Sequence, residues 1–253
     1  MGEKIKLSES NHKIIYRDGD KLYKTFSESY NISQILNEAL NQAKVHEAGI
    51  HTPKVFGVGE YEGRNAIIME YIDGEDLFSL LKKDKSKMDD YMEKFTKIHH
   101  EIMSNQFVSL INSYGKTKSK IFNSNLPANI KYGLFYKLRE LDFTKDIIHG
   151  DFILSNVIID KKGNFIVVDW AHAAYGNRKF DIAVSYALMD VLDGKNDIAE
   201  CYIEKMCKLE NVNKEQIFDL LPLAYVYIVD RFDDDKQKEI YDKIYQIIKL
   251  KEG

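Results

Sequence analysis

The chain has 253 residues, of which 44% are hydrophobic and 30% are charged, a composition typical of a soluble globular protein with one or two domains. Its 36 basic and 40 acidic side chains give a net charge of −4, so no basic field is present to bind nucleic acid. The longest apolar stretch, residues 220–229, contains Pro222 and is too short to span a bilayer, so we expect no membrane segment and a cytoplasmic location.

The N-terminal region predicts three short strands, at residues 4–7, 13–16 and 21–26. The turn before the last strand contains Asp18-Gly19, which is a strong hairpin signal. In that strand Leu22, Lys24 and Phe26 share one face of the pleat. A lysine between two inward-facing apolar side chains either reaches out to the sheet edge or is held there to bind phosphate.

A helix is predicted over residues 31–48, because apolar side chains recur there at helical spacing. Glu38 flanks its apolar stripe. On periodicity alone, a solvated surface position explains Glu38 nearly as well as an ion pair with Lys24, and Glu47 is a rival partner. A second hairpin, 55–59 with 66–71, follows this helix.

From residue 75 onward the pattern is mostly helical. Helices are predicted at 76–83, 88–103, 127–141, 182–192, 195–208, 214–230 and 234–250. Residues 104–126 are polar and irregular, and a stretch of that length is either mobile or a substrate-binding insert. Because no long linker is present, we expect two lobes, residues 1–73 and 74–253, packed about a cleft.

Residues 147–170 contain two apolar β-branched runs around a Lys-Lys-Gly-Asn turn, which predicts a β-hairpin. With the turn centred on Lys162-Gly163, Asn156 opens one strand directly across from Asp169, which closes the other. Opposed side chains on one sheet face lie roughly 4.5–5.5 Å apart at Cβ, so an amide oxygen and a carboxylate there can share Mg²⁺. Asp151 lies in the loop that enters the hairpin, so we expect it near the same end. An ordinary buried hairpin explains the strands but not three converging polar groups.

The segments His149-Gly150-Asp151, Asn156 and Val168-Asp169-Trp170 together resemble the catalytic core of eukaryotic-like kinases, in which H-x-D-x-x-x-x-N precedes a metal-binding Asp. Gly150 and Trp170-Ala171 are similar to the aminoglycoside phosphotransferase and choline kinase superfamily. Residues 176–183 resemble the segment after the metal-binding Asp in aminoglycoside 3′-phosphotransferases, where a residue comparable to Asp181 helps hold the catalytic loop. The resemblance implies an α+β, bilobal protein-kinase-like fold with a small antiparallel-sheet lobe and a larger, mainly helical lobe.

The resemblance also implies the cofactors, ATP or GTP together with Mg²⁺. It implies these nucleotide-binding residues: Lys24 for the phosphates, Glu38 as its ion-pair partner, Ser10 and Asn11 in the loop that covers the phosphates, and the backbone near Glu70 and Ile72 for the base. That loop lacks the G-x-G-x-x-G sequence of most protein kinases.

For the reaction, the resemblance implies that Asn156 and Asp169 hold Mg²⁺ and that Asp151 orients the acceptor hydroxyl and takes its proton. Ile153-Leu154 depart from the pattern, because relatives often have His-Pro there and protein kinases have a lysine two residues after the Asp. This departure weakens the interpretation as a protein kinase. It does not affect the interpretation as a kinase of small molecules.

The expected function is therefore an ATP-dependent phosphotransferase acting on a hydroxyl of an aminoglycoside, an amino alcohol or a sugar-like acceptor, with antibiotic resistance as one role. A cationic acceptor would suit the acidic residues at 190, 193, 197 and 230–235, although such a charge run is usually a solvated face. Two alternatives stay open, an atypical small protein kinase and a non-catalytic nucleotide-binding regulator. The sequence indicates no oligomeric state and no preference between ATP and GTP.

Overall fold

The structure is a computed structural model that describes residues 4–10, 12–105, 109–142, 144–193 and 197–252. The chain forms two compact units. The first contains residues 1–83 and 154–172, and the second contains 84–153 and 173–253. The boundaries of these compact units differ from those of the two predicted lobes, residues 1–73 and 74–253. The division into lobes stays a prediction.

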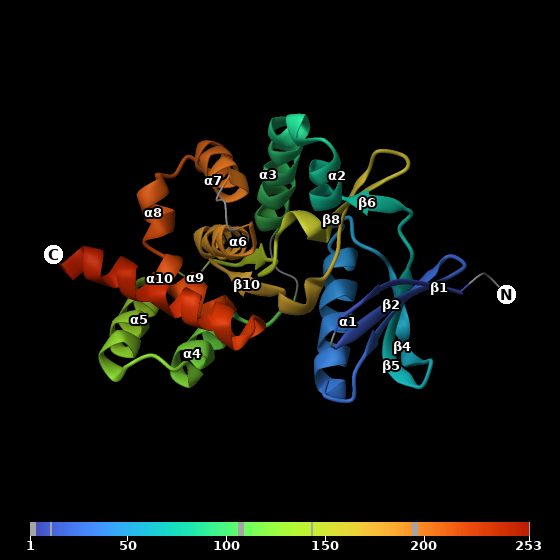
Figure 1. Cartoon of the computed structure of the whole chain (residues 1–253), viewed down its shortest axis with the longest axis horizontal. Coiled ribbons are helices and arrows are strands. Elements are labelled where there is room, and N and C mark those ends of the chain that lie inside the picture. Colours follow the sequence, from blue (N-terminus) through green and yellow to red (C-terminus); the bar gives the residue numbers. More distant parts are fainter. Residues whose placement is uncertain (1–3, 11, 106–108, 143, 194–196, 253) are drawn as a thin grey trace. The chain divides into compact units, whose positions relative to one another are not determined.

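The first unit is built on a five-stranded antiparallel sheet in the order β1-β2-β3-β5-β4 (Figure 1). Its strands are β1 (Lys4–Glu9), β2 (Lys13–Asp18), β3 (Lys21–Phe26), β4 (Val55–Tyr61) and β5 (Arg64–Glu70). Both predicted hairpins are confirmed. Glu62 and Gly63 connect β4 to β5 with φ angles of 54° and 69°, the left-handed conformation that a tight hairpin turn requires.

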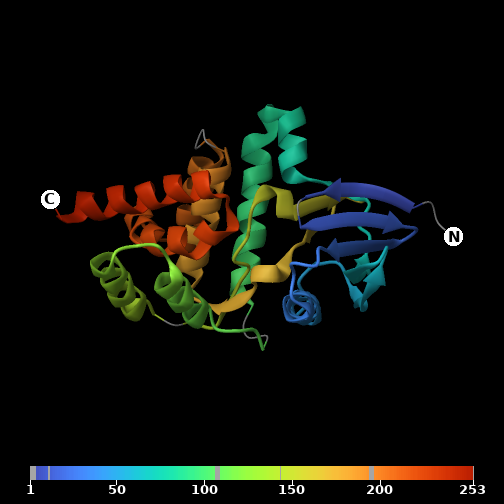
Figure 2. The same ribbon diagram turned by 60° about the horizontal axis from the view of Figure 1, so that its bottom comes forward.

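Helix α1 (Ile32–Glu47) lies along one face of this sheet, and Figure 2 shows it nearly end-on below the strands. The helix begins after Asn31, whose backbone N–H donates to the Gln34 side chain at 3.1 Å. Ile35 and Ala39 point from α1 into the core formed with Phe26, Ile67 and Met69. Of the apolar stripe predicted for residues 31–48, Ile35 and Ala39 are buried, whereas Ile32 and Leu36 are about half exposed, so the prediction is correct only in part.

The hairpin predicted at residues 157–168 is also present. Strands β6 (Gly74–Asp76), β8 (Val157–Asp160) and β9 (Phe165–Val167) form a sheet in the order β6-β8-β9. The predicted register is wrong by one residue, because Val157 pairs with Val167 and the Val168 N–H donates to the Asn156 carbonyl at 2.9 Å. Asn156 therefore lies across from Val168, and Asp169 follows the strand.

The turn of this hairpin explains the difference in register. Gly163 has a φ of 85°, and its N–H donates to the Asp160 carbonyl at 3.0 Å. The Asp160 N–H in turn donates to the Asn164 carbonyl at 2.9 Å, so the loop comprises residues 161–163. A loop with a left-handed glycine at its third position is a common hairpin connection, and it shifts the pairing by one residue from that of a turn centred on Lys162-Gly163.

The first unit is completed by helix α2 (Leu77–Lys83) and the short 3₁₀ helices η2 (Leu154–Asn156) and η3 (Trp170–His172).

The second unit is mainly helical. Its helices are α3 (Met88–Ser104), α4 (Ser113–Asn123), α5 (Ala128–Glu140), α6 (Arg178–Asp193), α7 (Asp197–Glu210), α8 (Lys214–Phe218), α9 (Leu221–Ile228) and α10 (Asp234–Glu252), with 3₁₀ helices η1 (Lys85–Lys87) and η4 (Val229–Arg231). Helix α6 packs against α7, α8 and α9. The short strands β7 (Asp146–Ile148) and β10 (Ala174–Gly176) pair antiparallel, and β7 leads into the loop that contains Asp151. No helix within the described part of the chain is both long and apolar enough to cross a membrane.

Two helix predictions in this unit are corrected. The single helix predicted at 214–230 is divided into α8 and α9, and Pro222 lies in the first turn of α9, where its missing N–H is tolerated. Residues 104–126, predicted to be irregular, contain α4. Asn112 caps α4 by accepting from the Tyr114 N–H at 2.8 Å. The buried positions of α4 include Ser113 and Thr117, so its inward face carries too little apolar character to show in the sequence.

Candidate active site

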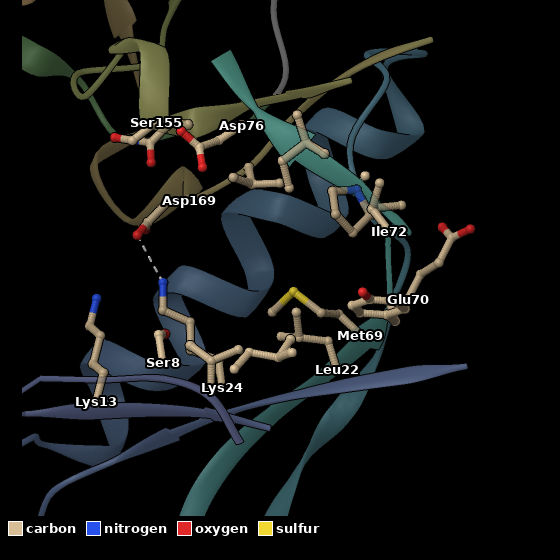
Figure 3. Close-up of a pocket in the computed structure, with 18 of the residues that line it drawn as sticks. Ser8, Lys13, Leu22, Lys24, Met69, Glu70, Ile72, Asp76, Ser155 and Asp169 are labelled. Carbon is tan, nitrogen blue, oxygen red and sulfur yellow. Dashed lines mark ion pairs between the residues drawn. The ribbon is translucent and has the colours of Figure 1, made fainter. Parts of the chain in front are cut away.

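The first unit contains a pocket of about 710 Å³, a size that suits a nucleotide (Figure 3). Apolar side chains, among them Leu22, Met69 and Ile158, line one part of it. The predicted nucleotide-binding residues Ser10, Lys24, Glu70 and Ile72 line the pocket, and so do the predicted metal ligands Asn156 and Asp169. Asn11 lies outside the described residues. The structure thus brings together the described part of the predicted nucleotide and metal site, whose binding roles stay predictions.

Lys24 lies at the centre of a charged cluster in this pocket. Its Nζ is 2.5 Å from Oε1 of Glu38 and 3.0 Å from Oδ2 of Asp169, so the predicted ion pair with Glu38 is present. Lys24 is only 7% exposed and Glu38 only 4%. Burial alone would lower the pKa of Lys24, but the attraction of Asp169 and Glu38 outweighs it and raises that pKa well above its ordinary value. Lys24 is therefore a permanently charged, pre-positioned cation.

Asp169 follows β9 with a φ of 63°, a left-handed conformation that is uncommon for a residue other than glycine. Burial would raise the pKa of its carboxyl, but Lys24 and then Lys13 lower it well below the usual range. Its Oδ1 atom is buried and has no hydrogen-bond partner within the described residues. A buried carboxylate oxygen without a partner is costly unless a ligand supplies one.

The donors at this position fit Mg²⁺, which prefers carboxylate and amide oxygens and usually completes its shell with water and substrate phosphates. Asn156 and Asp169 supply one amide and one carboxylate in the same pocket. Among the described side chains, no group of three His, Cys, Asp or Glu residues forms a metal site by itself. Where substrate phosphates and water complete the shell of Mg²⁺, one or two protein ligands are enough, so Asn156 and Asp169 fit such a site.

Lys13 is a second cation that the sequence did not single out. It comes from β2, lines the pocket and lies 3.9 Å from Oε2 of Glu38. In Figure 3 the amino groups of Lys13 and Lys24 both point toward the side of the pocket that carries Asp169. The first unit thus holds two lysines where a polyphosphate would lie.

The predicted base-binding segment borders the apolar part of the pocket. The Glu70 N–H donates to the Lys54 carbonyl at 2.9 Å, and the Tyr71 N–H donates to the Asp20 carbonyl at 3.0 Å. Both amides are therefore used inside the fold. A nucleotide base at Glu70 would have to use its carbonyl instead.

The second unit holds the loop that contains Asp151. The Asp181 carboxylate accepts from the backbone N–H groups of His149 at 2.8 Å and Gly150 at 2.9 Å, and His99 Nε2 lies 3.0 Å from it. The expectation that Asp181 holds this loop is thus confirmed. Gly150 has a φ of 73°, so a residue with a side chain would be strained there.

Arg231 is the residue at this loop that the sequence did not identify. Its Nη1 donates to Oδ1 of Asp151 at 3.1 Å and to the Gly150 carbonyl at 2.9 Å. The acidic neighbours Asp230, Asp233, Asp234 and Asp235 are exposed, so the interpretation of that run as a solvated face is correct for them. No sequence signal separated Arg231 from this run, since only the fold brings it to Asp151.

The architecture of the chain is the protein-kinase-like fold of aminoglycoside phosphotransferases and choline kinase-like proteins. A thermostable mutant of the aminoglycoside phosphotransferase APH(4)-Ia in its apo form matches with a TM-score of 0.70 at 13% identity, covering 100% of this chain and 96% of that chain. A choline/ethanolamine kinase family protein from Mesorhizobium loti has a TM-score of 0.63 at 15% identity, covering 98% and 88%. An aminoglycoside-3′-phosphotransferase of type VIII has a TM-score of 0.64 at 12% identity, covering 89% and 93%. These similarities confirm the predicted fold.

The sequence comparison agrees with the fold. Residues 123–199 match the model of the phosphotransferase enzyme family. The matched segment includes Asp151, Asn156, Asp169 and Asp181. No curated protein matches this chain in sequence. The predicted resemblance to the aminoglycoside phosphotransferase and choline kinase group is therefore confirmed by a family model and by solved structures, which are kinases that act on hydroxyl groups.

Proposed function

We propose that this protein is an ATP-dependent phosphotransferase that moves the γ-phosphoryl group to a hydroxyl of a small molecule. The observation that carries the proposal is the ion cluster of the buried Lys24 and Glu38 with Asp169 in a nucleotide-sized pocket. A purely structural ion cluster would not need an unpartnered carboxylate oxygen at Asp169 or a second lysine beside it. A site that receives a magnesium polyphosphate explains both features.

In the proposed mechanism Lys24 binds the α- and β-phosphates, and Glu38 holds the lysine in place. Asn156 and Asp169 would hold Mg²⁺, which neutralises charge on the phosphates. Asp151 orients the acceptor hydroxyl. The acceptor oxygen forms a bond to the γ-phosphorus, the bond from that phosphorus to the β–γ bridging oxygen breaks, and ADP leaves. The hydroxyl proton passes to Asp151 and then to solvent.

The comparisons do not determine the acceptor, so its chemical class is part of the proposal. APH(4)-Ia has been determined in a ternary complex with ADP and hygromycin B, which supports a nucleotide and a small hydroxyl compound as ligands here. Aminoglycosides, amino alcohols and sugar-like compounds are the candidates, and antibiotic resistance would follow only if the acceptor were an aminoglycoside. We also propose a cytoplasmic location, where ATP is available.

Thermal unfolding with nucleotide tests the first step. MgATP should raise the unfolding temperature of the wild type, because a ligand that binds only the folded state stabilises it by mass action. Asp169→Asn should reduce the Mg²⁺-dependent part of this shift, whereas Asp160→Asn, in the hairpin turn, should leave it intact. A wild type that no nucleotide stabilises would contradict the proposal and favour a protein without a working cleft.

A further inference from the structure

Three basic side chains come together in the second unit, close to the loop that carries Asp151. Lys116 and Lys120 lie one turn apart on α4, and Arg231 ends η4. We call these three residues the basic cluster. Helix α4 packs against α9, which leads directly into η4.

Arg231 connects the basic cluster to the proposed base. One of its terminal nitrogens binds both Asp151 and the Gly150 carbonyl. Its Nε is buried and has no hydrogen-bond partner among the residues that the structure describes. The guanidinium lies over the ring of Tyr227, 5.2 Å from the ring centroid. The Tyr227 hydroxyl is also buried and, within the same described ranges, has no hydrogen-bond partner. The Arg231 Nε–H and the Tyr227 hydroxyl are thus two buried donors, near Asp151, for which no acceptor is found among the described residues.

Lys116 adds a partly buried positive charge to this region. Its Nζ donates to the Ala173 carbonyl at 3.1 Å. Burial, followed by repulsion from Arg231 and Lys120, lowers the pKa of Lys116 to about 8. Lys120 is paired with Asp230. Lys116, Lys120 and Arg231 thus place three cations in one region of the second unit.

We propose that the basic cluster binds an acceptor that carries an anionic group, a carboxylate or a phosphate, beside the hydroxyl that Asp151 orients. A guanidinium and a lysine amine are the donors that proteins use for such groups. A cationic acceptor would instead bring like charge against Arg231 and Lys116, which is unfavourable at short range. The inference rests on the proposed function and replaces the cationic acceptor expected from the acidic residues of the sequence.

Two other observations agree with an anionic acceptor. Of the acidic side chains that would suit a cation, Asp190 is buried, binds the Tyr225 hydroxyl at 2.5 Å and pairs with Lys243 at 3.0 Å, so its carboxylate is already used inside the fold. The remaining acidic run after Arg231 is exposed to solvent. The side chain that contacts the Asp151 carboxylate is the cation Arg231.

The test is a charge-matched acceptor panel assayed with MgATP. On glucose and glycerol scaffolds it compares the uncharged alcohol, its amine, its carboxylate and its phosphate, with kanamycin and choline added as cations. We expect the highest kcat/KM with the carboxylates or the phosphates. Comparison of these two derivatives identifies which of the anionic groups the protein prefers. Preference for the amines, kanamycin or choline would overturn the inference and leave the proposed function standing. Absence of phosphorylation across the whole panel would overturn the proposed function itself, and the inference with it.

Variants of α4 provide the matched control. Lys116→Gln should lower kcat/KM for the anionic acceptor about tenfold or more, since hydrogen bonds to charged groups contribute most in desolvated sites, and should change it little for the uncharged analogue. Lys118→Gln removes the same charge from an exposed position of the same helix and should have no such effect. Lys116→Arg keeps the charge and should keep the preference. Equal effects of Lys116→Gln and Lys118→Gln would overturn the inference.

Discussion

Nη1 of Arg231 lies 3.1 Å from Oδ1 of Asp151. The same nitrogen donates to the Gly150 carbonyl at 2.9 Å, so one guanidinium fixes both the backbone and the side chain of the proposed catalytic loop. A planar group with several donors in fixed directions suits this double contact better than a single ammonium does.

Replacing Arg231 should therefore lower the rate of phosphoryl transfer and have little effect on the affinity for the nucleotide. We expect Arg231→Lys to lower kcat about tenfold or more, because a small displacement of an orienting carboxylate is costly in rate, while KM for ATP changes little. Steady-state kinetics measure this separation. Arg139→Lys, at an exposed position of α5, is the control. An unchanged kcat for Arg231→Lys would show that the contact with Asp151 has no role in the reaction.

Asp181 should be a large contributor to stability, because its fully buried carboxylate satisfies two backbone amides and contacts His99. Asp181→Ala would leave these donors unsatisfied, so we expect a loss on the order of 3–5 kcal/mol in the free energy of unfolding. Urea denaturation measures the loss. Asp235→Ala, on the exposed start of α10, should change the same quantity by no more than about 0.5 kcal/mol. A similar small effect at both positions would refute this role of Asp181.

Lys13 should act on the phosphates and not on the base. We expect Lys13→Gln to weaken MgATP binding several-fold and to leave adenosine binding unchanged, because only the triphosphate offers the amine a negative charge. Isothermal titration of the two ligands makes the comparison, with Lys21→Gln at the exposed start of β3 as the control. Equal losses for ATP and adenosine would instead indicate a change in the fold of the pocket.

The acceptor preference should depend on pH through Lys116. Its pKa in the folded protein, about 8, lies below the ordinary value of 10.5. As pH rises through about 8, the folded protein loses this charge while the unfolded chain keeps it, so the cost of burying the cation falls and stability rises. The attraction for an anionic acceptor is lost over the same range, so kcat/KM for that acceptor should fall above pH 8. Lys116→Arg should flatten this decrease, since arginine stays protonated. A decrease of the same size in the variant would assign it to another group.

The parts of the fold that could be predicted depend on local patterns. The alternation around Lys24, the helix α1 and the two hairpins that contain Gly19 and Gly63 each involve residues close in the sequence. The pairing of Lys24 with Glu38 needed the family resemblance as well, because periodicity alone left Glu38 and Glu47 as alternatives.

The parts that could not be predicted depend on features that the residue pattern hides. The register of β8 and β9 depends on whether the loop uses two residues or three, and Lys-Lys-Gly-Asn allows both. Helix α4 buries serine and threonine, which leaves no apolar stripe to recognise. Arg231 reaches Asp151 only through tertiary structure, because the two residues are 80 positions apart in the chain.

The most direct test of the central claim is detection of a phosphorylated acceptor by mass spectrometry after incubation of the full chain with MgATP and the acceptor panel. The wild type should form a phosphorylated small molecule and ADP in equal amounts, and Asp151→Asn should form the product far more slowly at an unchanged KM for ATP. Release of ADP without a phosphorylated acceptor, or transfer by Asp151→Asn at the wild-type rate, would contradict the proposed function or the role of Asp151, respectively.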